Sequence, residues 1–270
     1  MGRASPARGE GAARLVSVLS LSWLHAALYV APVQHEDTAV RPLSTKSLRG
    51  ALLFRGVSDA LVAAFQAQAY IEKFCEGESL WRAGDLATRF TVITRGLVQI
   101  QRGTPNGDYA ILGVFGPNES IGDGAAIERL AYPASAWALS DVQVARIPAE
   151  LVLHAMQRDE RLMRCVHAAL VRHADALAAK IDIVSAGSVP ARLAVLHLQL
   201  AERFGDENDA QATFVPLSLS RSTLSRLVSA RVETVIRVLS SWQRSKLLRS
   251  VDGGFEIPDL EGLRAIASEG

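Results

Sequence analysis

The feature that most constrains the fold is a change of periodicity close to residue 148. From about Ile71 to Ile147, short runs rich in Val, Ile, Phe and Thr are separated by glycine-containing breaks. The breaks recur roughly every 6 to 12 residues, a spacing that predicts an all-β barrel or sandwich. From about Ala149 to Ser185 the chain contains neither glycine nor proline, which predicts one long helix.

The predicted helix carries a regular apolar seam. A helix of about 35 residues is much longer than the globular mean of about 11–12 residues. The seam follows alternating steps of three and four, the spacing of a coiled coil. Its members are Met163, Val166, Leu170, His173 and Leu177, with Lys180 and Val184 continuing the pattern. Such a seam predicts a helix that pairs symmetrically with a second copy of the chain. Packing of the helix on the β domain is the alternative.

Positive charge is concentrated in one short segment near the C-terminus. Between Leu217 and Arg249 there are seven Lys or Arg residues and one acidic residue, whereas the whole chain carries a formal net charge of +1. The pattern predicts two short helices joined by a turn at Ser229, with the second helix beginning at Val232. A basic helix-turn-helix is typical of proteins that bind duplex DNA, because Lys and Arg neutralise the phosphates.

Two residues of the second helix are predicted to read bases. Glu233 and Arg237 are four residues apart and therefore share one helix face. Arginine can bind guanine through two hydrogen bonds, and glutamate can accept one from cytosine; a surface salt bridge between the two side chains is the alternative. The other predicted DNA-binding residues are Ser218, Ser220, Ser222, Arg231, Thr234 and Lys246.

The segments on either side of the two helices complete a winged module. Pro190 is placed to begin a helix that runs to about Phe204. Residues 246–257 predict a β-hairpin with an Asp-Gly-Gly turn, and residues 259–267 predict a short closing helix. We therefore expect a β domain at residues 44–148, a long helix at 149–186 and a DNA-binding domain at 187–270.

The first 43 residues fit none of these domains. Residues 1–14 are small and basic, and residues 15–33 carry no formal charge, which resembles a secretory signal. Serine, histidine and proline residues interrupt the apolar run. We interpret residues 1–43 as a disordered or partly helical extension, or as a stretch translated from a misplaced start. A membrane anchor at residues 15–33 is the alternative.

The composition excludes several classes of protein. Cys75 and Cys165 are the only cysteines, too few for a disulfide framework, a four-cysteine zinc site or an all-cysteine iron–sulfur cluster. Free thiols suit the cytoplasm. The sequence contains no phosphate-binding loop, dinucleotide fingerprint, zinc-protease motif or nucleophile elbow. We therefore predict a cytoplasmic protein that is not an enzyme and has no metal site.

The order of these elements resembles the Crp/Fnr family of bacterial transcription regulators. Residues 232–237, Val-Glu-Thr-Val-Ile-Arg, look like the family's Val-Glu-Thr-Ile-Ser-Arg pattern, with Ile236 where the oxygen-sensing branch has serine. In the β domain, the resemblance is carried by residues 80–85, 92–96, 116–123 and 135–137. It implies an α+β fold with a jelly-roll-like β-roll sensor domain, a long dimerisation helix and a C-terminal winged helix-turn-helix.

The resemblance also implies a function. A homodimer would bind a palindromic, TTGA-like site in double-stranded DNA through the helix at residues 232–245. It would contact RNA polymerase if it is an activator, and an effector, a redox signal or a gas at the β-roll would control it. A constitutive DNA-binding regulator without a ligand is the first alternative. A membrane-tethered ligand-binding module is the second, from a different class.

The resemblance places an effector pocket at Gly122, Asp123, Ala134 and Ser135. The cAMP-binding branch has Arg-Ser where this chain has Ala134-Ser135, so the arginine that holds the cyclic phosphate is missing, and we expect no cAMP binding. Four cysteines would be needed for the iron–sulfur cluster of the oxygen-sensing branch, and we expect no cluster. Haem bound through Cys75 or one of the six histidines is an open alternative.

Overall fold

The computed structural model describes residues 41–42, 48–105, 107–206 and 212–269. The predicted N-terminal extension, residues 1–43, lies outside the described residues except for positions 41 and 42, which form strand β1. The candidate membrane anchor at residues 15–33 is not among the described residues. No helix in the described part of the chain is both long and apolar enough to span a membrane.

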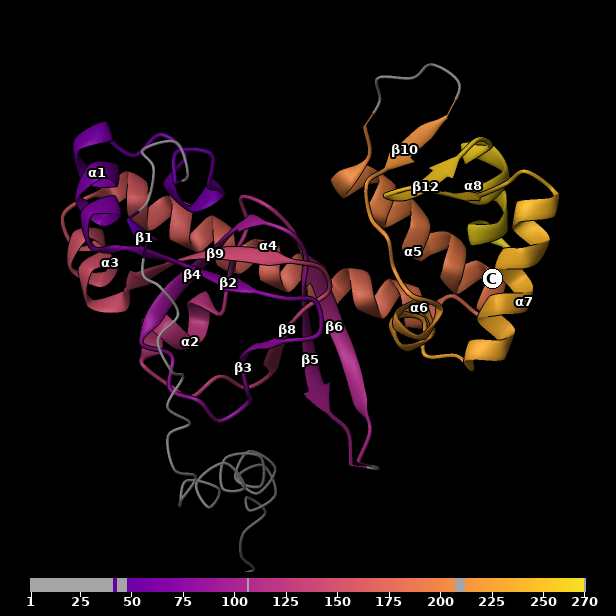
Figure 1. The fold of residues 1–270 in the computed structure, drawn as a ribbon, viewed down its shortest axis with the longest axis horizontal. Coiled ribbons are helices and arrows are strands. Elements are labelled where there is room, and N and C mark those ends of the chain that lie inside the picture. The colour runs from indigo at the N-terminus through magenta and orange to yellow at the C-terminus, as the bar shows by residue number, and fades with distance from the viewer. Residues whose placement is uncertain (1–40, 43–47, 106, 207–211, 270) are drawn as a thin grey trace, which may run out of the picture. The chain divides into compact units, whose positions relative to one another are not determined.

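Two antiparallel sheets form the predicted β-roll (Figure 1). The first sheet has the order β1-β2-β9-β4-β7, and the second has the order β3-β8-β5-β6. The strands are β1 (Arg41–Pro42), β2 (Tyr70–Phe74), β3 (Ser79–Trp81), β4 (Arg89–Arg95), β5 (Val98–Gly103), β6 (Tyr109–Phe115), β7 (Ser120–Ile121), β8 (Ser135–Ala138) and β9 (Val142–Pro148). The regularly spaced glycine breaks therefore did mark the ends of strands.

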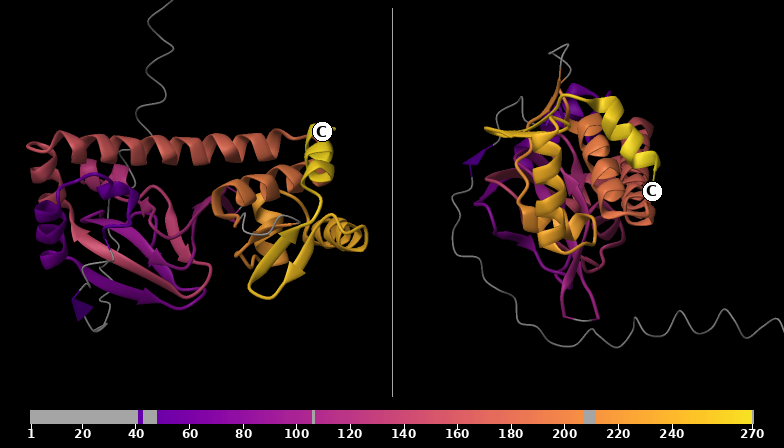
Figure 2. Two further views of the ribbon diagram at one scale, coloured as in Figure 1. Left: turned by 90° about the horizontal axis from the view of Figure 1, so that it is seen from above. Right: turned by 90° about the vertical axis from the view of Figure 1, so that its right-hand side faces the viewer.

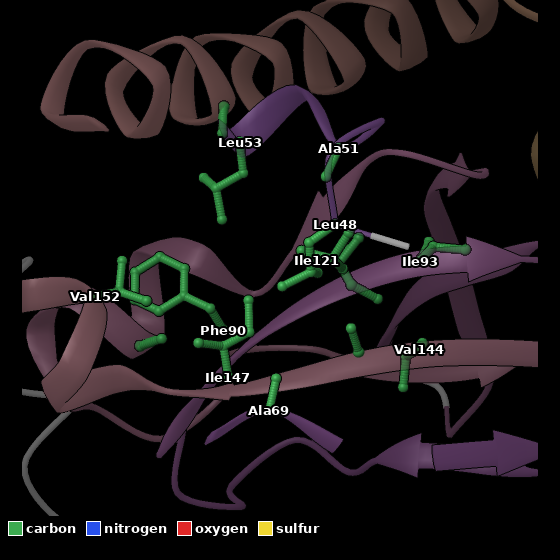
Figure 3. Packing of buried hydrophobic residues seen from close by; sticks show 14 of the residues in the cluster. Leu48, Ala51, Leu53, Ala69, Phe90, Ile93, Ile121, Val144, Ile147 and Val152 are labelled. Carbon is green, nitrogen blue, oxygen red and sulfur yellow. The ribbon is translucent and has the colours of Figure 1, made fainter. Parts of the chain in front are cut away.

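Helices cover the first sheet and close the core of the roll. They are η1 (Leu52–Phe54), α1 (Asp59–Gln68), α2 (Asp123–Glu128) and α3 (Ala149–Met156). Phe90, Ile93 and Ile147 on the paired strands β4 and β9 are fully buried, and Leu53 and Val152 from the helices pack into the same cluster (Figure 3). Burial of apolar surface contributes about 25 cal/mol per Å² and is the main favourable contribution to the folding of such a core.

The long helix predicted at residues 149–185 is two helices. The first, α3, ends at Met156, and α4 runs from Glu160 to Ser185, 26 residues. The Asp159 side chain accepts a hydrogen bond from the backbone N–H of Leu162, so Asp159 acts as an N-cap and starts a new helix. Figure 2 shows α4 as one continuous helix, which packs on α2, β6 and η1 of the roll and on α5.

The C-terminal domain is the predicted winged helix-turn-helix. Its helices are α5 (Val189–Phe204), α6 (Arg221–Leu227), α7 (Val232–Arg244) and α8 (Leu260–Ser268). Strands β10 (Thr213–Val215), β11 (Arg249–Val251) and β12 (Gly254–Ile257) form a sheet in the order β10-β12-β11. Gly253, in the predicted Asp-Gly-Gly turn, has φ of 75°, a conformation that favours glycine. The expected fold class is confirmed.

Candidate nucleic-acid interface

Helix α6 begins with a serine cap. The Ser220 hydroxyl accepts a hydrogen bond from the Thr223 backbone N–H at 3.0 Å, the bond typical of a serine N-cap. The turn that follows α6 is fixed by a bond from the Ala230 N–H to the Ser225 carbonyl and by a left-handed Ser229, with φ of 53°. This turn sets the direction in which α7 leaves α6.

Helix α7 has a buried face that holds it in place. Val235, Leu239 and Trp242 lie in the core of the domain. The rings of Trp242 and Phe255 meet the imidazole of His197 edge-on, with centroids 6.0 and 5.1 Å from it. His197 is buried, and its Nδ1 lies 2.7 Å from the Leu193 carbonyl oxygen. Burial lowers the pKa of His197 to about 4, so the imidazole is neutral at pH 7.

The opposite face of α7 is exposed and chemically mixed. Glu233 and Arg237 both point to solvent. Within the described part of the chain, no ion pair joins these two side chains, so the salt-bridge alternative is not the arrangement found. Ile236, beside them, is 46% exposed. The face therefore presents an acceptor, a bidentate donor and an apolar surface within two turns.

A small cavity lies where α6 meets the wing. Its volume is about 250 Å³, and its lining includes Ser218, Ser220, Arg221 and Ser250. The Arg221 guanidinium donates to the Ser250 hydroxyl at 3.3 Å. Sequence reasoning missed Arg221 and Ser250, although an arginine directly after an N-cap was a signal for the first of them.

The remaining predicted DNA-contact residues are distributed around this surface. Ser222, Arg231 and Lys246 are exposed, whereas Thr234 is half-buried. Lys246 has φ of 60° at the end of α7 and lies directly before the wing. The structure thus brings the predicted residues to the exposed sides of α6, α7 and the segment between α7 and β11.

The first effector-pocket residue, Gly122, faces an aromatic stack. The rings of Trp81 and Tyr132 are stacked with centroids 4.2 Å apart. A Cβ atom at Gly122, which has φ of 75°, would lie 2.6 Å from Tyr132. Gly122 is thus needed both for its backbone conformation and for the close approach of Tyr132.

The other predicted pocket residues on this side already have backbone partners. The Trp81 indole N–H donates to the Ala134 carbonyl oxygen, and the Ser135 hydroxyl accepts from the Ala83 N–H. A buried arginine lies nearby in the roll. Arg146 donates hydrogen bonds to Glu72, Thr91 and the Leu80 carbonyl oxygen, so it is fully engaged within the fold.

Asp123 points instead toward α4. It is fully buried, its Oδ2 hydrogen-bonds to the Ser120 hydroxyl and lies 4.0 Å from His173 Nε2. His173 in turn hydrogen-bonds to the Ser120 carbonyl oxygen. Burial raises the pKa of Asp123, and His173, Ser120 and Arg172 oppose the rise. Among the described residues, Asp123 Oδ1 has no hydrogen-bond partner.

The predicted dimer seam on α4 divides between two faces. Val166 is fully buried in the core of the roll, and His173 bonds to Ser120, so both face their own chain. Leu170 is half-buried, and Met163 and Leu177 are exposed. The exposed apolar side chains of α4 are Met163, Val171, Leu177 and Ile181. Val166 and His173 are thus engaged within their own chain, while the seam stays a prediction for Met163, Leu170 and Leu177, beside which Val171 and Ile181 are also exposed.

Lys180, predicted on the seam, instead caps α6. Its ammonium group donates to the carbonyl oxygens of Leu227 and Arg226 at the end of that helix, where the helix dipole favours a cation. Burial lowers the pKa of Lys180 to about 8. Arg226 pairs with Asp108, and its guanidinium lies over the Tyr109 ring. Helix α6 thus contacts both α4 and the β5–β6 hairpin.

The potential metal-ligating side chains in the described part of the chain are not gathered in one cluster. This part holds no group of three or more His, Cys, Asp or Glu side chains that could bind a metal ion. Cys75 is exposed, with its backbone N–H bonded to Glu78. The Cys165 thiol lies on α4 and donates to the Arg55 carbonyl oxygen.

Comparison with known proteins identifies both domains. Residues 71–159 match the cyclic nucleotide-binding domain, and residues 191–266 match the Crp-like helix-turn-helix domain. The chain belongs to the Crp/Fnr family of DNA-binding transcription regulators. Within that family, a CRP-like cAMP-activated global transcriptional regulator of Mycobacterium tuberculosis is 27% identical over 215 residues, covering 78% of this chain and 94% of the relative.

Two further comparisons agree with this assignment. The transcriptional activator protein FnrA of Stutzerimonas stutzeri is 27% identical over 192 residues, 71% of this chain and 78% of the relative. A crystal structure of a putative cyclic nucleotide binding protein from Ruegeria pomeroyi has a TM-score of 0.55 and 26% identity, covering 83% of this chain and 96% of that one. The predicted family is therefore confirmed.

Proposed function

We propose that this Crp/Fnr-type regulator is a homodimer that reads a roughly palindromic, TTGA-like DNA site through α7. The observation that carries the proposal is the exposed face of α7, on which Glu233 and Arg237 are not paired with each other. Arg237 would bind guanine through two hydrogen bonds, and Glu233 would accept one from cytosine. The buried face of the helix, anchored by Trp242, would fix both side chains in the major groove.

The surrounding residues are proposed to hold the phosphates. Ser218, Ser220 and Ser222 lie at or next to the beginning of α6, and Arg231 and Thr234 begin α7. Lys246 lies between α7 and the wing. Hydroxyl groups, ammonium groups and backbone N–H groups at helix starts are typical phosphate contacts, which position a protein on DNA without reading its sequence.

The exposed stripe on α4 supports the dimer. Four large apolar side chains on one helix, Met163, Val171, Leu177 and Ile181, are 36–62% exposed in the single chain. A second copy of α4, related by a two-fold axis, would cover them. The two recognition helices would then reach half-sites about one turn of DNA apart.

We propose that the β-roll responds to a signal other than cAMP. Ala134 offers no cation for a cyclic phosphate, and Arg146 is engaged with Glu72 and Thr91. Loss of a charge-assisted hydrogen bond costs about 1.5–3 kcal/mol. Haem, a redox signal and regulation without a ligand are retained as alternatives. Action in the cytoplasm, and contact with RNA polymerase if the protein activates, belong to the same proposal.

The test is DNA binding by Arg237→Ala. The site is first selected from random duplexes with the full-length protein, and affinities are then measured by titration on that site and on a random duplex. The variant should lose about 1–3 kcal/mol on the selected site and lose its preference at one base pair. An equal loss on both duplexes would show that Arg237 does not read a base.

Arg249→Ala and Lys246→Ala are the matched controls. Each removes one exposed cation next to or within the wing. Both DNA sequences should bind more weakly by a similar factor, and the slope of log affinity against log salt should fall by about one. A loss confined to the selected site would contradict the phosphate assignment.

A further inference from the structure

Ile236 is an exposed apolar side chain on the helix that is proposed to read DNA. Among the described residues of the C-terminal domain, it is the only large apolar side chain that is exposed, with 46% of its surface accessible. A single exposed apolar residue on a protein surface needs no explanation by itself. Its position on α7 is what distinguishes this one.

The position of Ile236 is set by the geometry of α7. It follows Glu233 by three residues, so the two side chains are neighbours on the helix surface, and it directly precedes Arg237. The other exposed residues of α7 are polar or charged: Glu233, Arg237, Ser240, Ser241, Gln243 and Arg244. Ile236 also lies in the first two turns of the helix, the part of a recognition helix that contacts base edges.

We infer that Ile236 determines specificity by contacting the C5-methyl group of a pyrimidine next to the bases read by Glu233 and Arg237. The inference rests on the proposed function of α7. In the major groove, the thymine methyl is the base-edge group that an apolar side chain can recognise. The ligand class is therefore a 5-methylpyrimidine: thymine, or 5-methylcytosine, which carries the same methyl group.

A branched apolar side chain suits this contact. Ile236 is β-branched, so its χ1 angle is restricted in a helix and little conformational freedom would be lost on contact. It has no donor or acceptor, and therefore it discriminates by the presence of a methyl group and not by hydrogen bonding. A polar base edge against Ile236 would lose hydrogen bonds to water without replacement.

The experiment removes the methyl group from the DNA and the apolar group from the protein. On the selected site, each thymine of the half-site is replaced in turn by deoxyuridine, and affinity is measured for the wild type and for Ile236→Ser. One replacement should weaken the wild type about fourfold per half-site, the effect of withdrawing about 0.8 kcal/mol of methyl burial. The same replacement should change Ile236→Ser affinity by less than about 1.5-fold, because the contact is already absent.

Two matched variants test whether the effect belongs to the side chain. Ile236→Val keeps a branched apolar group and should keep the sensitivity to deoxyuridine. Ser240→Ala changes a neighbouring exposed position of α7 and should also keep it. Cytosine and 5-methylcytosine, each paired with guanine at the sensitive position, supply the second arm. Methylation should raise the affinity of the wild type and not that of Ile236→Ser.

The outcomes separate this inference from the proposed function. If the selected site binds better than random DNA but no deoxyuridine replacement distinguishes the wild type from Ile236→Ser, the methyl contact is wrong and DNA reading by α7 stands. If no duplex is preferred over random DNA, the proposed function fails and the inference fails with it. Since Ile236 is exposed, thermal unfolding of Ile236→Ser should match that of the wild type.

Discussion

Asp123 in the β-roll and His197 in the DNA-binding domain are both completely buried titratable groups, but their surroundings differ. His197 bonds to the Leu193 carbonyl oxygen and is enclosed by Trp242 and Phe255. Asp123 bonds to Ser120 through one oxygen, while the other lacks a partner in the described part of the chain.

The comparison separates a buried group whose hydrogen bonding is satisfied, His197, from one whose hydrogen bonding is incomplete, Asp123. Buried polar atoms are almost always hydrogen-bonded, and an exception calls for an explanation. His197 is a satisfied part of a rigid core that supports α7. Asp123 lies where the roll meets α4, and Arg172 Nη2 on that helix is also buried without a partner among the described residues. The sensor domain, not the DNA-binding domain, is therefore where the described structure leaves interactions unmade.

The largest expected effect is a loss of stability of the DNA-binding domain at low pH. The pKa of His197 falls from 6.5 to about 4 in the folded state. Between these values the unfolded chain binds a proton that the folded chain does not, so stability falls as the pH drops from about 6.5 to 4. One pKa unit corresponds to about 1.4 kcal/mol, which gives a loss of about 3 kcal/mol. Urea unfolding followed by circular dichroism at several pH values would measure it.

His197→Asn is the matched variant for that measurement. The asparagine amide can donate to the Leu193 carbonyl oxygen and cannot be protonated in this range. The variant should be less stable than the wild type at pH 7, because it packs less well, and should lose less stability on acidification. Parallel pH profiles for the two proteins would mean that His197 is protonated equally easily in the folded and unfolded states.

A smaller effect of the opposite pH dependence is expected from Asp123→Asn. Burial raises the pKa of Asp123 in the folded state, so the unfolded chain releases its proton first, and the folded state loses stability as the pH rises above about 3.9. Asparagine stays neutral, and the variant should therefore be more stable than the wild type at pH 7 to 8, where the aspartate would have to ionise in a buried site.

The same urea titrations would test Asp123. The advantage of the asparagine variant should grow from pH 4 to pH 8. Asp175→Asn, an exposed change on α4, should leave stability unaltered. A variant that is less stable than the wild type, increasingly so at high pH, would show that Asp123 is held as an anion by His173 and Arg172. The contrast with His197 would then disappear.

The smallest effect concerns the contact between the roll and α6. The Asp108–Arg226 pair is largely exposed on the Asp108 side, at 65%, and exposed ion pairs contribute little to stability. A double-mutant cycle with Asp108→Ala and Arg226→Ala would isolate the pair from the stacking of Arg226 on Tyr109. The coupling should fall in 1 M salt. Coupling that is unchanged by salt would mean that packing, not charge, joins the two regions.

The sequence was sufficient to predict the order of the elements and much of the DNA-binding surface. Short-range signals carried both: glycine breaks marked the strands, the basic run at residues 217–249 marked the helix-turn-helix, and the four-residue spacing of Glu233 and Arg237 placed them on one face of α7. Such signals act within a few residues of each other, so they are visible without a structure.

The sequence could not show two features of α3 and α4, for physical reasons. The break between α3 and α4 depends on one N-cap, Asp159, whose local bond outweighed an otherwise continuous helical pattern. The seam on α4 depends on contacts that are distant in sequence. A helix turns by about 100° per residue, so neighbouring positions can face either the roll or solvent. The bonds of His173 to Ser120 and of Lys180 to α6 turn these two side chains toward their own chain.

The exposed stripe on α4 has a consequence for gene dosage. In the proposed dimer, Met163, Val171, Leu177 and Ile181 are covered only when two chains meet. At chain concentrations well below the dimer dissociation constant, the number of dimers varies with the square of the amount of protein. A doubling of expression would then raise DNA occupancy about fourfold at an unsaturated site, so the amount of protein in the cell is itself an input to the regulator.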